Sequence, residues 1–427
     1  MLTAALLATL AGFSADPTKT ERASGWKNYS GSDASSLWQG YRQKSFPAKG
    51  WALEGGELKQ TGPGGGDLVT AAQFTDVEMI CDFKLDKESN SGIMWRVTET
   101  TGETYMTGPE YQLLDDAGWL AKGALKDSQL TGSLYDLLPA PKVKLSLPAG
   151  EWNQARIYIR NGLVQHWLNA KKVAEVKAFE SDGKPTKQWQ ALIAASKFKD
   201  APGFGIQPKG ALALQDHGGG IAFRDIKIRD LSAPSPGEIQ LWNGKDLTGW
   251  QAIVPEAKDK GIKPEDVWYV KDGELICKGT PAGYIRTTKD YKNFIIKLEW
   301  RFDPTKGAGN SGVLFRMVGQ DKVWPKSVEA QLQSGQAGDF WNIDDVKMTV
   351  AKDRTNGRNT KRTSTAERPI GDWNEYEIIV DHGLVILKVN GEELNRATDV
   401  EEVAGKICLQ SEGSQIHFRN IRLIPLD

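Results

Sequence analysis

The sequence contains few cysteines, and their positions suggest neither a metal site nor a disulfide framework. Its 427 residues include three cysteines, Cys81, Cys277 and Cys408. The count is odd, the spacing fits no metal motif, and each cysteine lies in an apolar run. We therefore expect buried, unreactive thiols.

Net charge and long apolar runs are also scarce. The formal net charge is −1 and the basic residues are evenly spread, which excludes the basic footprint of a nucleic-acid-binding protein. The longest apolar run, residues 2–15, is shorter than the roughly 20 residues of a membrane-spanning helix, so we expect no transmembrane segment. The run ends in small residues. We therefore expect residues 1–24 to form a signal peptide and polar leader, although no basic residue precedes Lys19.

The sequence also lacks the short motifs of several large enzyme classes. It contains no HExxH, GxSxG, Walker A or Rossmann fingerprint. These absences argue against zinc peptidases, α/β-hydrolases, P-loop nucleotidases and dinucleotide-dependent enzymes. No cofactor is required by any motif that is present.

Short alternating runs and 45 glycines predict an all-β protein with many turns. Asn161-Gly162 and Asn390-Gly391, each between alternating apolar and polar residues, are strong hairpin signals. A helical pattern occurs at residues 187–198, inside a segment, 178–210, that has no counterpart later in the chain. Helix is therefore expected to be rare.

The sequence contains two copies of one module. NSGIMWRV at 90–97 returns as NSGVLFRM at 310–317, and several other segments recur in the same order, among them GEWN at 150–153 with GDWN at 371–374. A proline-rich stretch at 233–237 separates the copies. We predict two domains, 25–232 and 238–427, joined by a linker at 233–237, each a two-sheet β-sandwich of jelly-roll type.

Polar residues recur on one predicted face of each copy. Because strand side chains alternate, Ser91, Ile93, Trp95 and Val97 should point inward and Arg96 should point outward beside Gly92 and Met94. The following strand brings a glutamate and a glutamine to one face, so we expect an open polar cluster in each copy. Its members are Arg96, Glu110 and Gln112, and in the second copy Arg316, Glu329 and Gln331. The alternative is a pair of structural ion pairs on a solvated surface.

Other candidates lie near this cluster. Asp115 follows the glutamate strand, Asn90 begins the preceding one, and His217 lies in a glycine-rich loop where a histidine can act as acid, base or ligand. Trp119 and Trp189 are candidate stacking surfaces for sugar rings. No spacing requires a metal ion, although His217, Glu110 and Asp115 could ligate a divalent one.

Taken together, LWNGKDLTGW (241–250), NSGIMWRV, GPEYQLLDD (108–116), GEWN, LQDHG (214–218) and FRDIKI (223–228) resemble the 3-keto-disaccharide hydrolase family over nearly all of both copies. The resemblance implies concanavalin-like jelly rolls of the glucanase type in a periplasmic or secreted bacterial protein. It also implies cleavage of glycosides oxidised to a ketone at C3, by hydrolysis or elimination. The substrate would be an oxidised disaccharide or other glycoside.

The resemblance assigns roles to the polar residues. Glu110 or His217 would be the base that removes the C2 proton, and Arg96 and Gln112 would stabilise the enolate oxygen. Asp115 would orient His217 or bind a sugar hydroxyl. Because Asp115 and His217 occur in the first copy alone, we expect catalysis mainly in the N-terminal copy.

Two other functions remain open at this point. A direct glycoside hydrolase would need two carboxylates at a defined separation, for which Glu110 and Asp115 are the candidate pair. A carbohydrate-binding protein without catalysis would use the tryptophans. The sequence does not specify the oligomeric state.

Overall fold

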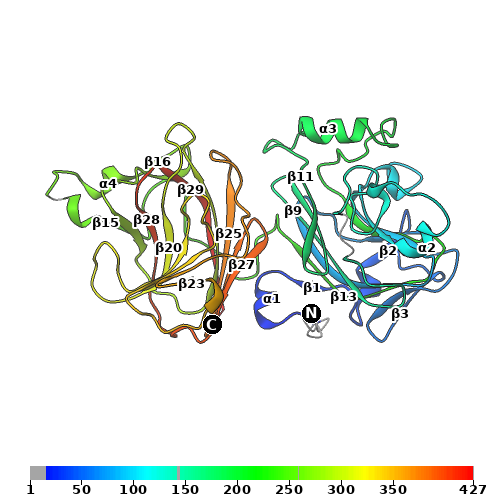
Figure 1. Cartoon of the computed structure of the whole chain (residues 1–427), viewed down its shortest axis with the longest axis horizontal. Coiled ribbons are helices and arrows are strands. Elements are labelled where there is room, and N and C mark those ends of the chain that lie inside the picture. Colours follow the sequence, from blue (N-terminus) through cyan, green and yellow to red (C-terminus); the bar gives the residue numbers. More distant parts are fainter. Residues whose placement is uncertain (1–15, 142–144, 258, 427) are drawn as a thin grey trace, which may run out of the picture. The chain divides into compact units, whose positions relative to one another are not determined.

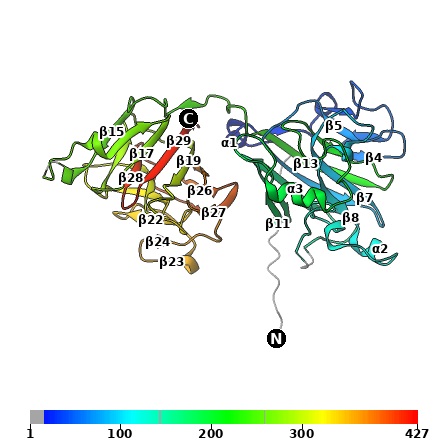
Figure 2. The ribbon, with the colours of Figure 1, turned by 90° about the horizontal axis from the view of Figure 1, so that it is seen from above.

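A computed structural model of the chain describes residues 16–141, 145–257 and 259–426. The predicted signal segment at 2–15 lies outside the described residues. The chain forms two compact units, one ending at Pro234 and one beginning at Ser235, and strands predominate in both (Figures 1 and 2). The helices described are short: α1 (Lys19–Ala23), α2 (Asp116–Leu120), α3 (Lys187–Ala194) and α4 (Pro264–Val267).

The first unit consists of two antiparallel sheets. The larger has the order β11 (Lys171–Lys177), β10 (Leu163–Leu168), β9 (Asn153–Arg160), β6 (Val77–Leu85), β13 (Ile221–Asp230), β4 (Glu57–Gln60) and β3 (Trp51–Glu54), with β1 (Lys27–Asn28) also paired to β13. The smaller has the order β2 (Trp38–Gly40), β5 (Leu68–Thr70), β12 (Ala211–Leu214), β7 (Asn90–Val97) and β8 (Glu110–Leu114).

The second unit repeats this topology. Its first sheet has the order β27 (Glu392–Ala397), β26 (Leu384–Val389), β25 (Asn374–Asp381), β19 (Phe294–Phe302), β29 (Ile416–Pro425), β17 (Glu274–Cys277) and β16 (Trp268–Lys271), with β14 (Ile239–Gln240) paired to β29. Its second sheet has the order β15 (Trp250–Ile253), β18 (Gly283–Thr287), β28 (Lys406–Ser411), β20 (Gly312–Met317), β21 (Ser327–Gln331), β22 (Phe340–Ile343), β24 (Asn359–Thr360) and β23 (Thr355–Asn356). The predicted all-β class and tandem jelly-roll sandwiches are confirmed.

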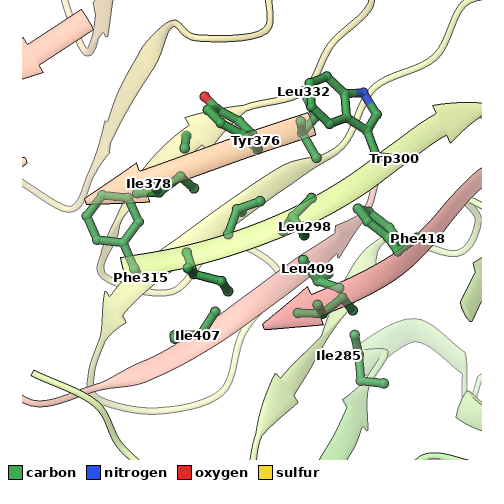
Figure 3. Close-up of a cluster of buried hydrophobic side chains, with 14 of the residues drawn as sticks. Ile285, Leu298, Trp300, Phe315, Leu332, Tyr376, Ile378, Ile407, Leu409 and Phe418 are labelled. Carbon is green, nitrogen blue, oxygen red and sulfur yellow. The ribbon is translucent and has the colours of Figure 1, made fainter. Parts of the chain in front are cut away.

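Each unit is held together by the apolar faces of its two sheets. In the second unit, Trp300 on β19 and Tyr376 on β25 lie with ring centroids 5.5 Å apart, and Phe315 and Leu409 reach the same core from the opposite sheet (Figure 3). Removal of this apolar surface from water is the main force that stabilises the sandwich. Strand alternation leaves the outer faces of the sheet with β7 and β8 and of the sheet with β20 and β21 for other residues.

The predicted hairpin at Asn161-Gly162 and the predicted helix are both present. Asn161 and Gly162 both have positive φ, 49° and 77°, and join β9 to β10 in a two-residue turn. Helix α3 begins after Thr186, whose side chain accepts a hydrogen bond from the Trp189 backbone, and it ends at Ala194 rather than at residue 198. The three cysteines are free and buried, as predicted. Within the described residues, no helix has the length and apolar character needed to cross a membrane.

A β-bulge breaks the predicted alternation in both NSG strands. Arg96 has φ 55° and Arg316 has φ 51°, and the pairing of β7 with β12 and of β20 with β28 shifts at these points. An extra residue in one strand turns every later side chain to the other face. Val97 therefore packs with Met94 on the outer face of its sheet, so its predicted inward position was wrong.

The core of the first unit contains a histidine that gives a testable pH dependence. His166 on β10 is buried against the Tyr111 ring, with centroids 4.7 Å apart, and burial lowers its pKa to about 3. In the unfolded chain the His166 side chain has a pKa near 6.5. Between about pH 3 and pH 6.5 it therefore binds a proton in the unfolded state that it does not bind in the folded state. The His166 contribution to stability should therefore fall by about 1.4 kcal/mol per pH unit as pH drops below about 6.5. The raised pKa values of Glu110 and Glu329 contribute with the opposite sign over part of the same range.

The variant His166→Phe should lack this contribution, so its free energy of unfolding relative to wild type should rise as pH falls from about 6 to about 4 in urea-unfolding measurements. The matched control is His382→Gln, since His382 is exposed. An equal slope in wild type and His166→Phe would show that His166 is not the titrating group.

Candidate active site on the smaller sheet

A glutamate in the first unit lies directly over a glycine of the neighbouring strand. Glu110 on β8 pairs with Met94, and its carboxyl group extends over Gly92 of β7. A Cβ atom on Gly92 would lie 2.1 Å from Glu110 Oε1, so any other residue at this position would displace the carboxyl group. The glycine of the NSG motif thus makes room for Glu110.

Burial makes Glu110 a weak acid. The residue is 6% exposed, and burial raises the pKa of its carboxyl group to about 8. The positive charge of Lys197 opposes this rise, and the nearby carboxylate of Asp67 adds to it. A carboxyl group with such a pKa can take up and release a proton near neutral pH.

Amide side chains surround the same region of the sheet. Asn90, Gln112 and Gln215 each have a buried amide oxygen with no hydrogen-bond partner among the described residues. The Gln215 backbone N–H donates to Gly92 O at 2.9 Å, which places this residue beside the glycine. Buried polar groups without partners are uncommon in folded proteins. Their concentration beside Glu110 indicates a surface built to bind a polar molecule.

Asp67 and Thr104 form the other side of this region. The Thr104 hydroxyl donates a hydrogen bond to Asp67, and the Asp216 backbone N–H donates to Asp67 Oδ1 at 2.8 Å. Burial raises the pKa of Asp67 as well. Two carboxyl groups with raised pKa values therefore lie in this region, Glu110 on β8 and Asp67 just before β5.

The second unit repeats the glutamate and the glycine but changes the charge that faces them. A Cβ atom on Gly312 would lie 2.2 Å from Glu329 Oε1 and 2.6 Å from Gln410 Oε1. Burial raises the pKa of Glu329 to about 8, and the neighbouring carboxyl group of Glu412 adds to the rise. The first unit thus places a lysine near its glutamate, whereas the second places an acid there.

The arginines do not belong to this cluster, which corrects the prediction. Arg96 donates to the backbone carbonyls of Gln207 and Thr75, at 3.1 and 2.9 Å, and its guanidinium lies 4.0 Å from the Phe179 ring centroid. The positive φ at the bulge turns Arg96 away from Glu110. Arg316 similarly donates to the carbonyls of Val400 and His382. The predicted surface ion pairs and open face are also wrong, because both glutamates are buried.

Two other predicted binding residues bind the backbone of Glu88. Asp115 Oδ2 accepts from the Glu88 N–H at 2.8 Å, and Trp119 Nε1 donates to the Glu88 carbonyl at 3.0 Å. Glu88 has φ 59°, an uncommon backbone conformation that these contacts hold in place. The predicted sugar platform at Trp189 is wrong, since that ring is fully buried and stacks on Trp95.

His217 is exposed on the loop after β12, two residues beyond Gln215. Among the described residues, no three His, Cys, Asp or Glu side chains lie close enough together to hold one metal ion. His217, Glu110 and Asp115 therefore do not form the ligand set that the sequence allowed, and no chemical step is assigned to a metal here.

A family model described as 3-keto-alpha-glucoside-1,2-lyase-like domain matches residues 24–229 and again residues 237–424. The two matches together span most of the chain. The chain belongs to this family. The predicted tandem membership in the 3-keto-disaccharide hydrolase family is therefore confirmed.

Individual proteins and solved structures are also similar to this chain. A 3-keto-disaccharide hydrolase of Bacteroides thetaiotaomicron is 33% identical over 223 residues, covering 45% of this chain and 74% of that protein. A Parabacteroides distasonis structure, provisionally named a glycosyl hydrolase, is 29% identical with a TM-score of 0.44 and covers 51% of this chain and 98% of its own. A Bacillus licheniformis β-glucanase is 10% identical with a TM-score of 0.30, covering 44% and 99%.

The family motifs indicated some of the site residues but missed others. Gln215 could have been found, because the copies share LQ at 214–215 and 409–410. Lys197 belongs to the segment that the second copy lacks, and Asp67 has no sequence signal that links it to Glu110. Their place in the site follows from the packing of separate strands and loops.

Arg96 is expected to stabilise the fold rather than to act on substrate. Arg96→Met would leave the Gln207 and Thr75 carbonyls without their donor, at a cost of about 2–4 kcal/mol in the free energy of unfolding. Chemical denaturation should show this loss, and Arg96→Lys should recover part of it. Unchanged stability with lost enzymatic turnover would instead place Arg96 in the active site.

Proposed function

We propose that the first unit cleaves glycosides that carry a ketone at C3, with Glu110 as the catalytic base. The family match supports action on glycosides, and the Bacteroides thetaiotaomicron relative is named for the 3-keto substrate. The observation that carries the proposal is the Glu110 carboxyl group, buried over Gly92 with a pKa of about 8, in a region where three buried amide oxygens are unpaired.

The ketone determines the chemistry that such a site performs. A C3 carbonyl acidifies the proton on C2, and a base can remove it to give an enolate. The enolate electrons then form the C1–C2 double bond while the C1–O bond breaks, and the leaving group takes its electron pair and a proton. Water can add to the resulting double bond, which converts elimination into net hydrolysis.

Glu110 meets the requirements of the base. A carboxylate whose conjugate acid has a pKa near 8 is a stronger base than an exposed glutamate, and it still ionises near neutral pH. Lys197 favours the ionised form. The amides of Asn90 and Gln215 would donate hydrogen bonds to the enolate oxygen, a role that the sequence had given to Arg96. His217, on the exposed loop beyond Gln215, would supply the proton for the leaving group.

A direct two-carboxylate glycosidase is the second candidate, and one observation favours it. Asp67 is close enough to Glu110 to raise its pKa. However, Asp67 already accepts hydrogen bonds from Thr104 and from the Asp216 backbone. These contacts hold Asp67 in place and suit a supporting role better than that of a nucleophile.

The first test compares 3-keto-trehalose with unmodified trehalose, with and without a chelator. We expect cleavage of the keto form alone, and a loss of at least 100-fold in kcat/KM for Glu110→Gln, because glutamine cannot accept the C2 proton. Glu329→Gln is the matched control in the second unit and should retain turnover. Cleavage of plain trehalose would favour the two-carboxylate mechanism, and full activity of Glu110→Gln would refute the proposed base.

The second test measures kcat/KM against pH. Because the ionised form of Glu110 is the base, activity should rise with pH and level off above about 8, the pKa of Glu110. Lys197→Met should move this inflection to higher pH, since the lysine charge lowers the glutamate pKa. Lys197 is exposed, so the variant should fold normally. An inflection that does not move would assign the titration to another group.

A further inference from the structure

The sheet of the second unit that contains β20 and β21 carries a second polar site with a different composition. Asn310 lies directly opposite Glu412 in an isolated bridge, and Glu329 lies one strand away over Gly312. The carboxyl groups of Glu329 and Glu412 influence each other electrostatically. These residues lie on the same face as Gln410, whose side-chain oxygen also approaches Gly312.

A loop between β20 and β21 covers part of this face and brings a tryptophan to it. Asp321 anchors the loop, because its carboxylate accepts from the Tyr284 hydroxyl at 2.8 Å and from Arg286 at 3.1 Å. Trp324, three residues later, lies within hydrogen-bonding reach of the half-buried Glu412 carboxyl group. The Trp324 side chain is 51% exposed, so its ring is accessible beside this carboxyl group.

Several buried polar atoms beside Trp324 have no partner among the described residues. Gln410 is 1% exposed with both amide atoms unpaired, and Glu329 is 5% exposed with Oε1 unpaired. The Asn310 oxygen and the Trp341 indole nitrogen are also unpaired, and Trp341 lies directly across from Glu329 on β22. Leaving such groups unsatisfied costs about 1–3 kcal/mol each, so a bound molecule that pairs with them would gain affinity.

An exposed aromatic ring beside buried hydrogen-bonding groups matches the chemistry of a pyranose, which has one apolar face and a rim of hydroxyls. The neighbouring carboxyl groups of Glu412 and Asp321 disfavour an anionic ligand by charge repulsion. The charged neighbour that acts on Glu329 is the acid Glu412, whereas Glu110 has the cation Lys197 as well as the acid Asp67. This contrast separates the second site from the proposed catalytic one.

We propose that the second unit binds an uncharged pyranose of a glycan without cleaving it, with the sugar ring stacked on Trp324 and its hydroxyls paired to Asn310, Gln410 and Glu329. The binding site does not require catalysis at Glu110. It would hold the chain on a glycan while the first unit acts on an oxidised sugar.

The test uses the full chain and three uncharged probes, trehalose, maltotriose and cellotriose, with binding measured by calorimetry and by saturation-transfer NMR. We expect binding of at least one probe and a rise of tenfold or more in its Kd in Trp324→Ala. Gln410→Leu should weaken binding similarly by removing the buried amide. The matched control is Ile370→Ala, which truncates an exposed apolar side chain that lines a different cavity of the same unit.

The result of this binding test can be distinguished from the result of the turnover test of the catalytic proposal. Glu110→Gln should retain probe binding while it loses turnover, and Trp324→Ala should retain turnover of 3-keto-trehalose while it loses binding. Absence of binding by all three probes, or an unchanged Kd in Trp324→Ala, would overturn the inference. Turnover that persists in Glu110→Gln but disappears in Glu329→Gln would also overturn it, since the second unit would then be catalytic.

Discussion

The seating of a glutamate carboxyl group over a glycine is the contact on which both candidate sites depend. Glu110 over Gly92 and Glu329 over Gly312 are buried in the same way, and each carboxyl group would be displaced by a single added Cβ atom. Burial is also the first cause of both raised pKa values. One steric feature therefore sets the position of the acid and its protonation near neutral pH.

The arginine of the same motif has a supporting function. The bulge at Arg96 and at Arg316 turns each guanidinium toward backbone carbonyls of loops from other parts of its unit. A guanidinium presents several donors in a fixed plane, so it can bind more than one carbonyl at once. The bulge also ends the regular pairing beside the site. Each NSG strand thus contains both a glycine that belongs to the candidate site and an arginine that stabilises the fold.

The two units keep this framework and differ in what surrounds it. Residues 178–210 supply α3 and Lys197 to the first unit, and the second copy has no equivalent segment. The second unit has Glu412 and Trp324 near its glutamate instead. A nearby cation favours the ionised form of a carboxyl group, whereas a nearby acid disfavours it, so the same scaffold surrounds its buried glutamate with different charges in the two units.

The sequence alone determined the strand content, the tandem repeat, the Asn-Gly hairpins and the choice of Glu110 and Glu329. These features follow from local patterns and from comparison of one copy with the other. Tertiary structure alone decided that Arg96 leaves the cluster, because a single positive φ reverses the faces of a strand without changing its residue pattern. It also decided that Asp67 and Lys197 lie near Glu110. These residues are distant in sequence, and they are brought to one face by sheet pairing and loop packing.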